Sequence, residues 1–270
     1  MQKRMKKWLL GVSTVLCLGA AISCSTVPIT GRKQINLVSD SEMMTMSFSN
    51  YDQFLKENKL STNKEQTEMV KRCGDKIAKA VETFMAEKGW SDQISGFEWE
   101  FNLVDDETPN AWCMPGGKVV FYTGILPLTQ DEEGLAVVMG HEIAHAIAKH
   151  GNERMSQQMA VQGLGTALAV AIDEKPEQTK AIYMTAFGLG SQVGVMLPYS
   201  RMHETEADKM GLIFMALAGY NPEASIPFWT RMSQMGGQKP PEFMSTHPAD
   251  DTRINDLKAY MPEALKYYKK

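Results

Sequence analysis

The sequence predicts an α+β fold that is mostly helical and contains a small β-sheet. Apolar residues recur every three or four positions through long stretches, which is the spacing of a helix that packs on one face. Two short runs, residues 98–103 and 118–122, are instead rich in residues that favour strands. Without an N-terminal leader, roughly 245 residues remain, a length that one compact domain can fill.

In chain order, the first element is a predicted signal peptide over residues 1–23. Four basic residues among the first seven precede an apolar run over residues 8–22, which is the layout of a secretory leader and is short for a membrane-spanning helix. Residues 21–24 resemble a bacterial lipobox, with Ala21 in place of the more usual leucine. They predict that Cys24 becomes a lipidated N-terminus; the alternative is an ordinary cleaved leader with an unmodified Cys24.

The residue after Cys24 bears on the predicted location. Ser25 does not resemble an inner-membrane retention signal, so we expect an outer-membrane lipoprotein that faces the periplasm of a bacterium. Residues 24–40 are then a lipidated tether, and residues 41–270 are a single folded domain.

Charge and cysteine content limit the partners and the covalent structure of this domain. The formal net charge of −4 leaves no basic surface for nucleic acid, so no nucleic-acid partner is expected. Apart from the leader and Cys24, two cysteines remain, Cys73 and Cys113. They either pair as a disulfide or stay free, with Cys73 buried on a helical stripe.

A helix that carries two histidines is predicted over residues 129–151. Residues 129–132 have the form of a capping box, and Gly151 suits the left-handed residue that ends a helix. His141 and His145 lie four positions apart, so they project from one face as a zinc ion requires, and Glu142 can reach a metal-bound water. Gly140 indicates that another segment packs closely against this helix.

A second helix can supply a third ligand, because a catalytic zinc takes three protein ligands and leaves one position for water. It is predicted to open at Ser200 and to close at Gly219. Glu204 and Asp208 fall on one stripe of it. We expect Glu204 to bind the metal and Asp208 to accept a hydrogen bond from the free ring nitrogen of a zinc-bound histidine.

Three residues close to these motifs are expected to have other roles. His203 is rotated by about 100° from Glu204 on the helix and is the weaker ligand candidate. Glu206 is expected on a solvated acidic face. His150 follows His145 by five positions, off the shared face, and is interpreted as a structural residue near the helix end.

Together these motifs resemble those of the gluzincin-type zinc metallopeptidases that include the CAAX prenyl endopeptidases, the mitochondrial Oma-type protease and the periplasmic BepA and LoiP type enzymes. The short bacterial lipoprotein members are the most similar. The matching residues fall in the family's order and span most of the mature chain: His141-Glu142-x-x-His145, Glu204-x-x-Ala207-Asp208, Asn110 followed by Pro115-Gly116-Gly117, and Thr246-His247-Pro248 with Arg253.

The resemblance implies a minigluzincin-like zinc metallopeptidase domain over residues 41–270, with the sheet beside the histidine helix. One Zn²⁺ per chain would be bound by His141, His145 and Glu204. Glu142 would be the general base that takes a proton from the metal-bound water and passes it to the leaving amine.

His247 has two possible roles by the same resemblance. It would stabilise the oxyanion of the transition state, or it would occupy the metal's water position in a resting, inhibited form. The alternative is a histidine in a surface loop. Arg253 would stabilise that loop or the developing charge.

A strand beside the zinc helix would hold the substrate, because extended peptides often bind by adding a strand to a sheet edge. Residues 115–117 are expected to form a hairpin turn between the two β-rich runs. In the resembling enzymes the returning strand lines the cleft. We therefore expect residues 110–122 to contact the substrate backbone, with four of them as the named contacts: Asn110, Gly117, Val119 and Phe121. A purely structural hairpin is the alternative.

Two apolar segments lie between the zinc motifs, residues 159–172 and 181–197. We interpret them as a pair of core helices. A mobile flap over the cleft or a membrane-associated hairpin are the alternatives, although the first segment is short for a span and glycines and Gln192 interrupt the second.

The predicted function is zinc-dependent hydrolysis of peptide bonds in unfolded or misassembled proteins of the cell envelope. The expected partners are these polypeptides, together with a membrane reached through the N-terminal lipid. Two alternatives stay open: a zinc-containing chaperone or assembly factor with little cleavage, and a peptidase that is autoinhibited by His247.

Overall fold

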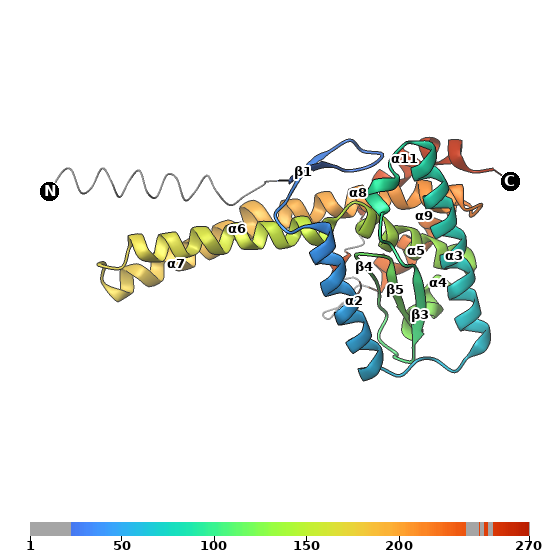
Figure 1. The fold of residues 1–270 in the computed structure, drawn as a ribbon, viewed down its shortest axis with the longest axis horizontal. Coiled ribbons are helices and arrows are strands. Elements are labelled where there is room, and N and C mark those ends of the chain that lie inside the picture. Colours follow the sequence, from blue (N-terminus) through green and yellow to red (C-terminus); the bar gives the residue numbers. More distant parts are fainter. Residues whose placement is uncertain (1–22, 236–242, 244–245, 248–250, 270) are drawn as a thin grey trace.

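The computed structural model describes residues 23–235, 243, 246–247 and 251–269. Helices surround a three-stranded sheet to form the body, and a long helical hairpin projects from it (Figure 1). The expected α+β fold with a small sheet is confirmed.

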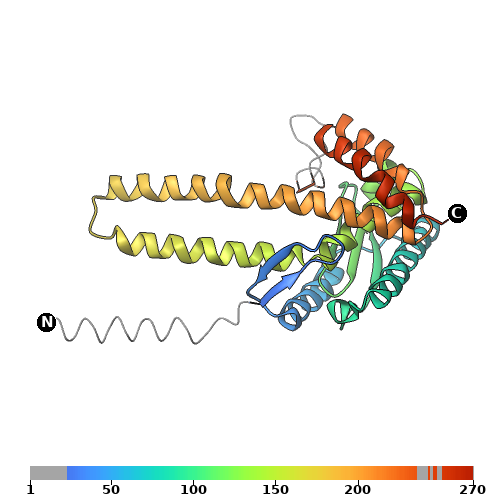
Figure 2. The same ribbon diagram turned by 90° about the horizontal axis from the view of Figure 1, so that it is seen from above.

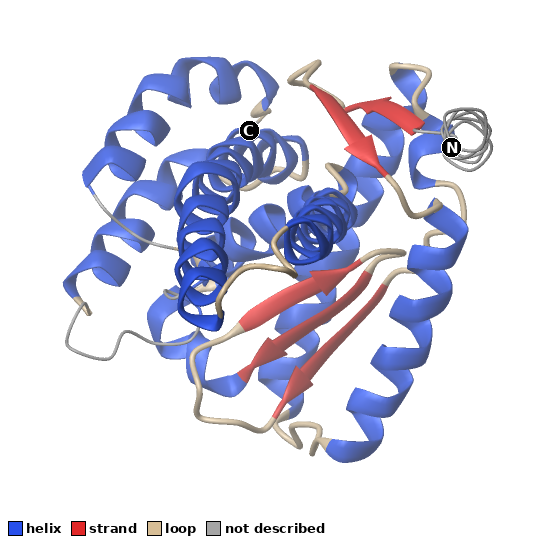
Figure 3. Cartoon of the chain, turned by 90° about the vertical axis from the view of Figure 1, so that its left-hand side faces the viewer, coloured by secondary structure: helices blue, strands red, loops and turns tan. Residues whose placement is uncertain are grey.

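The sheet has the strand order β3-β5-β4, so β5 is central and β4 forms an edge (Figure 3). β3 (Glu100–Val104) runs parallel to β5 (Lys118–Tyr122), and β4 (Ala111–Met114) runs antiparallel to it. The expected hairpin between the runs 98–103 and 118–122 is therefore wrong. Gly116 and Gly117 have φ angles of 87° and 85°, which makes the tight turn that joins β4 to β5 instead.

Both faces of this sheet are covered. α3 (Lys64–Glu87) and α5 (Glu132–Ile147) pack on one face, where Phe101, Val119 and Phe121 join the main core. α2 (Asp40–Glu57) covers the other face through Tyr51, which contacts Val104 and Val120. Its N-cap Ser39 forms the predicted capping box with Glu42.

The histidine helix α5 is almost entirely buried, and its ends differ from those predicted. Its N-cap is Asp131, whose side chain accepts a hydrogen bond from the backbone N–H of Gly134. Thr129 ends the preceding short helix α4 (Leu126–Thr129). At the other end Lys149, with a φ of 57°, adopts the left-handed conformation that was expected of Gly151.

A close contact between two helices lies at Gly140, as predicted. A Cβ atom built on Gly140 of α5 would lie 2.8 Å from the backbone oxygen of Gly211 on α8 (Leu197–Leu217). A Cβ on Gly211 would lie 2.9 Å from the backbone nitrogen of His141. The two backbones therefore touch one residue away from the first histidine, which brings α8 beside it.

Residues 24–40, predicted as a tether, include a folded hairpin instead. β1 (Ser23–Thr26) pairs antiparallel with β2 (Lys33–Asn36), and β2 lies on α6 (His150–Ala171). Arg32 forms ion pairs with Glu153 and Glu206, which anchor the hairpin to two helices of the body. The lipidation of Cys24 stays a prediction, and the signal segment 1–22 lies outside the described residues.

The two apolar segments between the zinc motifs are not core helices. α6 and α7 (Glu177–Ser191) form an antiparallel arm that extends away from the body, and most of its side chains are exposed (Figure 2). A π-helical stretch, Gln192–Met196, joins α7 to α8, so the second helix starts well before Ser200. The combined helix Glu177–Leu217 is long and apolar enough to cross a membrane, by length and composition.

α11 (Asp251–Ala264) packs against α8, and α9 (Ser225–Gln234) packs against α11, α4 and α5 to complete the body. Gly219, with a φ of 85°, follows the end of α8 as predicted. Cys73 is buried in the core and Cys113 lies on β4, and both are free thiols, so the possible disulfide between them does not form.

Candidate active site

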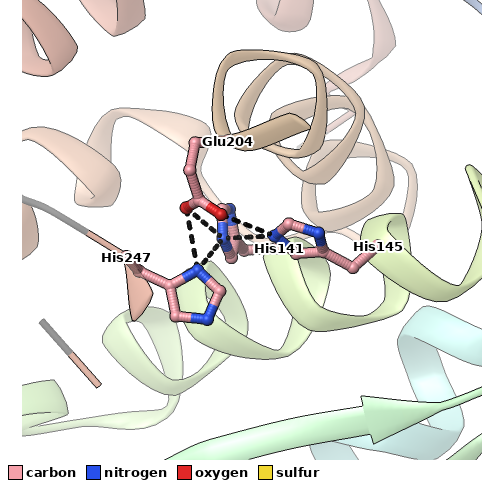
Figure 4. A group of neighbouring side chains, drawn as sticks. All are labelled: His141, His145, Glu204 and His247. Atoms are coloured by element: carbon pink, nitrogen blue, oxygen red, sulfur yellow. Dashed lines mark hydrogen bonds and ion pairs between the residues drawn. The ribbon is translucent and has the colours of Figure 1, made fainter. Parts of the chain in front are cut away.

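Four side chains converge on one point from three parts of the chain (Figure 4). His141 and His145 come from α5, Glu204 comes from α8, and His247 comes from the segment before α11. One nitrogen or oxygen atom of each lies within 4.8 Å of the others. Nε2 of His141 is 3.0 Å from Nε2 of His145 and 3.3 Å from Oε2 of Glu204.

This donor set fits a zinc ion, which binds imidazole nitrogens and carboxylate oxygens in a tetrahedron. Burial lowers the pKa of His145 and also that of His247, the latter to about 3, whereas the hydrogen bond with Asp208 outweighs burial and raises the pKa of His141 to about 9 in the metal-free protein. Burial works against ionisation of Glu204, but its contacts with His145, His141 and His247 hold its pKa well below the usual range. The carboxylate therefore stays charged.

Glu142 lies beside this cluster and is buried. Its Oε1 is 3.5 Å from Nε2 of His247 and has no hydrogen-bond partner within the part of the chain that the structure describes. Burial raises the pKa of Glu142 to about 8. A carboxyl group with a raised pKa at such a position can take up and return a proton near neutral pH.

Asp208 contacts the ring nitrogen of His141 that faces away from the cluster, as predicted. Nδ1 of His141 lies 2.9 Å from Oδ1 of Asp208, which leaves Nε2 directed at the cluster. Arg253 binds the same carboxylate through Nε at 2.8 Å and Nη2 at 2.6 Å. Its guanidinium also lies 3.3 Å from the ring centroid of Trp229, so Arg253 is held in place by charge and by stacking.

A second set of side-chain contacts orients the ring of His145. Its Nδ1 lies 2.8 Å from Nδ1 of His150, and Nε2 of His150 lies 3.0 Å from Oε2 of Glu206. Glu206 in turn pairs with Arg32 at 2.8 Å. The interpretation of Glu206 as a solvated residue is therefore wrong, because the N-terminal hairpin covers it and supplies its partner.

His203 belongs to the same buried group. Its ring stacks on that of His150 with centroids 4.2 Å apart, and its Nε2 lies 2.9 Å from Oε2 of Glu153. His203 therefore points away from the metal ligands, as its rotation on the helix predicted.

A cleft of about 340 Å³ opens over the cluster. Asn110, His145 and His247 line it together with the edge strand β4. The other predicted substrate contacts are placed elsewhere: Val119 and Phe121 are fully buried in the central strand, and the backbone of Gly117 lies against Trp99. These three residues lie within the sheet and its turn. The residues of the sheet edge that line the cleft are Trp112 and Cys113 of β4.

Comparison with known proteins agrees with this geometry. Residues 72–261 match the model of peptidase family M48. The chain belongs to this family. The match covers both histidine-bearing turns of α5, the ligand and support residues of α8, His247 and Arg253.

Curated relatives of this M48 protein include mitochondrial metalloendopeptidase OMA1 of Schizosaccharomyces pombe, 34% identical over 88% of the chain and 66% of the relative. OMA1 of Saccharomyces cerevisiae is 36% identical over 65% of the chain and 50% of the relative. The beta-barrel assembly-enhancing protease of Yersinia pestis is 28% identical over 59% of the chain and 34% of the relative. The matched region thus spans between a third and two thirds of these proteins.

The relatives correct the predicted location. A bacterial outer-membrane lipoprotein facing the periplasm is contradicted, because the OMA1 proteins at 30% to 36% identity, from yeasts, a plant and vertebrates, are named as mitochondrial. The leader-like residues 1–23 misled the prediction, since basic residues before a short apolar run do not specify a compartment.

Sequence reasoning missed two contributors to the site of this M48 protein. Arg32 and Trp229 act through contacts with residues far away in sequence, and no local pattern indicates them. The edge strand β4 lies within the range 110–122 that was expected to contact substrate, but it was not predicted as a strand because it has only four residues and no apolar alternation. His150 was detectable as a histidine near the motif, but its contact with His145 needed the backbone turn at Lys149.

Proposed function

We propose that this chain is a zinc-dependent endopeptidase that hydrolyses peptide bonds of unfolded or misassembled proteins. The supporting observation is the convergence of His141, His145 and Glu204 beside the unpartnered carboxylate oxygen of Glu142. A zinc ion held by these ligands would polarise the scissile carbonyl and activate a water molecule.

The residues of the chain then have separate tasks. Glu142 accepts a proton from the attacking water and returns it to the leaving amine, a task suited to a carboxyl group whose pKa is about 8. Asp208 keeps Nε2 of His141 directed at the metal position. Arg253 keeps Asp208 in place and lies 3.5 Å from Oε2 of Glu204.

The polypeptide would bind along β4. This strand is an edge of the sheet and lies over α5, so a substrate segment added to it runs past the zinc ligands. The unpaired backbone groups of an edge strand bind an extended chain through its main chain, which suits substrates without a fixed sequence. The name of the Yersinia pestis relative, an assembly-enhancing protease, supports misassembled proteins as substrates.

His247 supports a second proposal, that the conformation described is a resting form of the peptidase. Its Nδ1 lies 2.8 Å from Oε2 of Glu204 and 3.1 Å from Nε2 of His141, among the zinc ligands. In that place it would occupy the fourth ligand position of a bound zinc ion, the position that a water molecule needs. Movement of His247 away from the ligands would open the position.

One experiment tests both proposals. Wild type, Glu142→Gln and His247→Ala are purified, their zinc content is measured, and each is incubated with an unfolded protein. We expect Glu142→Gln to retain zinc and lose cleavage, and His247→Ala to cleave faster than wild type. Equal, measurable cleavage by wild type and Glu142→Gln would overturn the peptidase proposal, and no cleavage by any of the three proteins, His247→Ala included, would favour a chaperone. Slower cleavage by a zinc-loaded His247→Ala would show that His247 assists the reaction instead of blocking it.

A further inference from the structure

The arm formed by α6 and α7 leaves an apolar surface uncovered. Val170 is 74% exposed, Ile182 69% and Leu189 64%. Further exposed apolar side chains lie along both helices and into the start of α8: Met159, Leu164, Tyr183, Met184, Val193, Leu197 and Tyr199. Such a surface in water is unfavourable and indicates a partner, because covering large apolar side chains is favourable.

The distribution of charge along the arm is that of a membrane hairpin. Residues 155–172 and 181–200 contain no charged residue. At 1.5 Å per residue these stretches extend about 27 Å and about 30 Å, which matches a hydrocarbon core of about 30 Å. Charges flank them at the two ends: Asp173, Glu174, Lys175, Glu177 and Lys180 at the tip, and Arg154 and Arg201 at the root.

The exposed surface goes around the helices and is not confined to one stripe. Residues 181–186 are all exposed, and six consecutive helical positions point in every direction around the axis. A protein partner would cover one face of such a helix, whereas lipid chains surround it. The backbone donors and acceptors of the arm are used within its helices, as a hydrocarbon environment requires.

The N-terminal chain meets the arm at its root. Leu37, just after β2, donates its backbone N–H to Oγ of Ser156 at 2.8 Å, and Asn152 donates to the carbonyl of Val38 at 2.7 Å. The hairpin formed by β1 and β2 therefore packs at the root of the arm, through the contact of β2 with α6.

We propose that the arm spans the hydrocarbon core of a phospholipid bilayer, with the body at one face and the charged tip at the other. The tip charges lie in the opposite headgroup region, and Arg154 and Arg201 contact lipid phosphates on the side of the body. The proposal does not depend on the peptidase activity.

A fluorescent label on the arm tests this arrangement without interference from the run 8–22. In the full chain with Cys17→Ser, Cys24→Ser and Cys113→Ser, a cysteine is placed at one of three exposed sites and labelled with the fluorophore NBD. Leu189→Cys reports the middle of the arm, Glu174→Cys its tip, and Leu60→Cys, on the body, is the matched control. Each protein is reconstituted into sealed phosphatidylcholine and phosphatidylglycerol vesicles, and thermal unfolding confirms that each retains its fold.

A spanning arm predicts three results. The label at Leu189 emits at shorter wavelength in vesicles and is quenched by lipids with a nitroxide deep in the acyl chain. Dithionite, which does not cross the bilayer, bleaches complementary fractions of the labels at Leu60 and Glu174, because these sites lie on opposite sides. Addition of detergent makes both fully accessible.

Other results would overturn the proposal. In vesicles that hold most of the protein in one orientation, equal bleaching at Leu60 and Glu174 would place the tip on the same side as the body. A label at Leu189 that vesicles do not change would leave the arm in water. A shift at Leu189 that grows with protein concentration and is insensitive to nitroxide lipids would show that a second copy of the chain covers the arm.

Discussion

Nδ1 of His145 and Nδ1 of His150 lie 2.8 Å apart, so the ring of one expected zinc ligand is held by a second histidine. Because Nε2 of His145 faces the other ligands, Nδ1 of His145 carries the proton and donates a hydrogen bond to Nδ1 of His150. Nε2 of His150 then donates to Glu206, 3.0 Å away. The tautomer that lets His145 bind a metal is thus maintained by a chain of buried contacts.

Removal of this contact should weaken metal binding. We expect His150→Ala to lower zinc affinity about 10- to 100-fold, because loss of a hydrogen-bond partner frees the ligand ring to rotate. Competition with a chromogenic chelator measures the affinity without reference to activity. His203→Ala is the control, since His203 bonds to Glu153 and does not touch His145. Equal losses in the two variants would mean that the effect is general disruption of the buried group.

Arg32→Ala should destabilise the whole domain. Arg32 neutralises two buried carboxylates, those of Glu153 and Glu206. Its side chain is 19% exposed, so the cost falls between about 1 kcal/mol for an exposed pair and about 3–5 kcal/mol for a buried one. Urea unfolding measures the change. Arg154→Ala, on an exposed side chain next to Glu153, should shift stability by no more than about 0.5 kcal/mol.

Gly140→Ala tests the contact between α5 and α8. Its new methyl group would lie 2.8 Å from the backbone oxygen of Gly211, and no flexible side chain is there to move aside. We expect a loss of about 1–3 kcal/mol in unfolding free energy and weaker zinc binding, because α8 carries Glu204.

Gly163→Ala is the matched control on an exposed helix. No atom lies within 4 Å of a Cβ placed there, so the substitution should be neutral or stabilise by up to about 1 kcal/mol. A stable Gly140→Ala protein with normal zinc affinity would show that the two helices can separate without harm.

The acid stability of the metal-free protein should depend on Glu132. Hydrogen bonds from Arg72, with contributions from Tyr220 and Lys76, lower the pKa of Glu132 from 4.5 to about 2. The folded protein therefore binds this proton less readily than the unfolded chain. The contribution of Glu132 is fully present above pH 4.5 and is lost as the pH falls towards about 2.

Melting temperatures measured between these pH values test this dependence. Glu132→Gln should lower the melting temperature at neutral pH and flatten its fall in acid. Glu177→Gln, whose carboxylate side chain is 88% exposed, should follow wild type. Parallel curves for wild type and Glu132→Gln would exclude Glu132 as a source of the acid sensitivity.

The parts of the site that sequence reasoning predicted are those encoded within single helices. His141, His145, Glu204 and Asp208 meet as expected because a spacing of four residues sets their common face and glycines mark the helix contact. Arg32 and Glu206 are 174 positions apart, and nothing local in either segment indicates the other. Apolar periodicity also failed for the arm, because the same pattern describes a helix in a protein core and a helix surrounded by lipid.

The helix that carries Glu204 is continuous with the arm. From Glu177 to Leu217 it runs for 41 residues, and Glu204 follows the last uncharged residue of the arm, Ser200, by about 6 Å along the axis. The backbone of this helix contacts that of α5 where Gly211 meets Gly140. A tilt of the entire helix about this contact would draw the carboxylate of Glu204 away from His141 and His145. A bend at Gln192–Met196 would leave the carboxylate in place. Mechanical force on the arm could thus be converted into a change at the metal ligands.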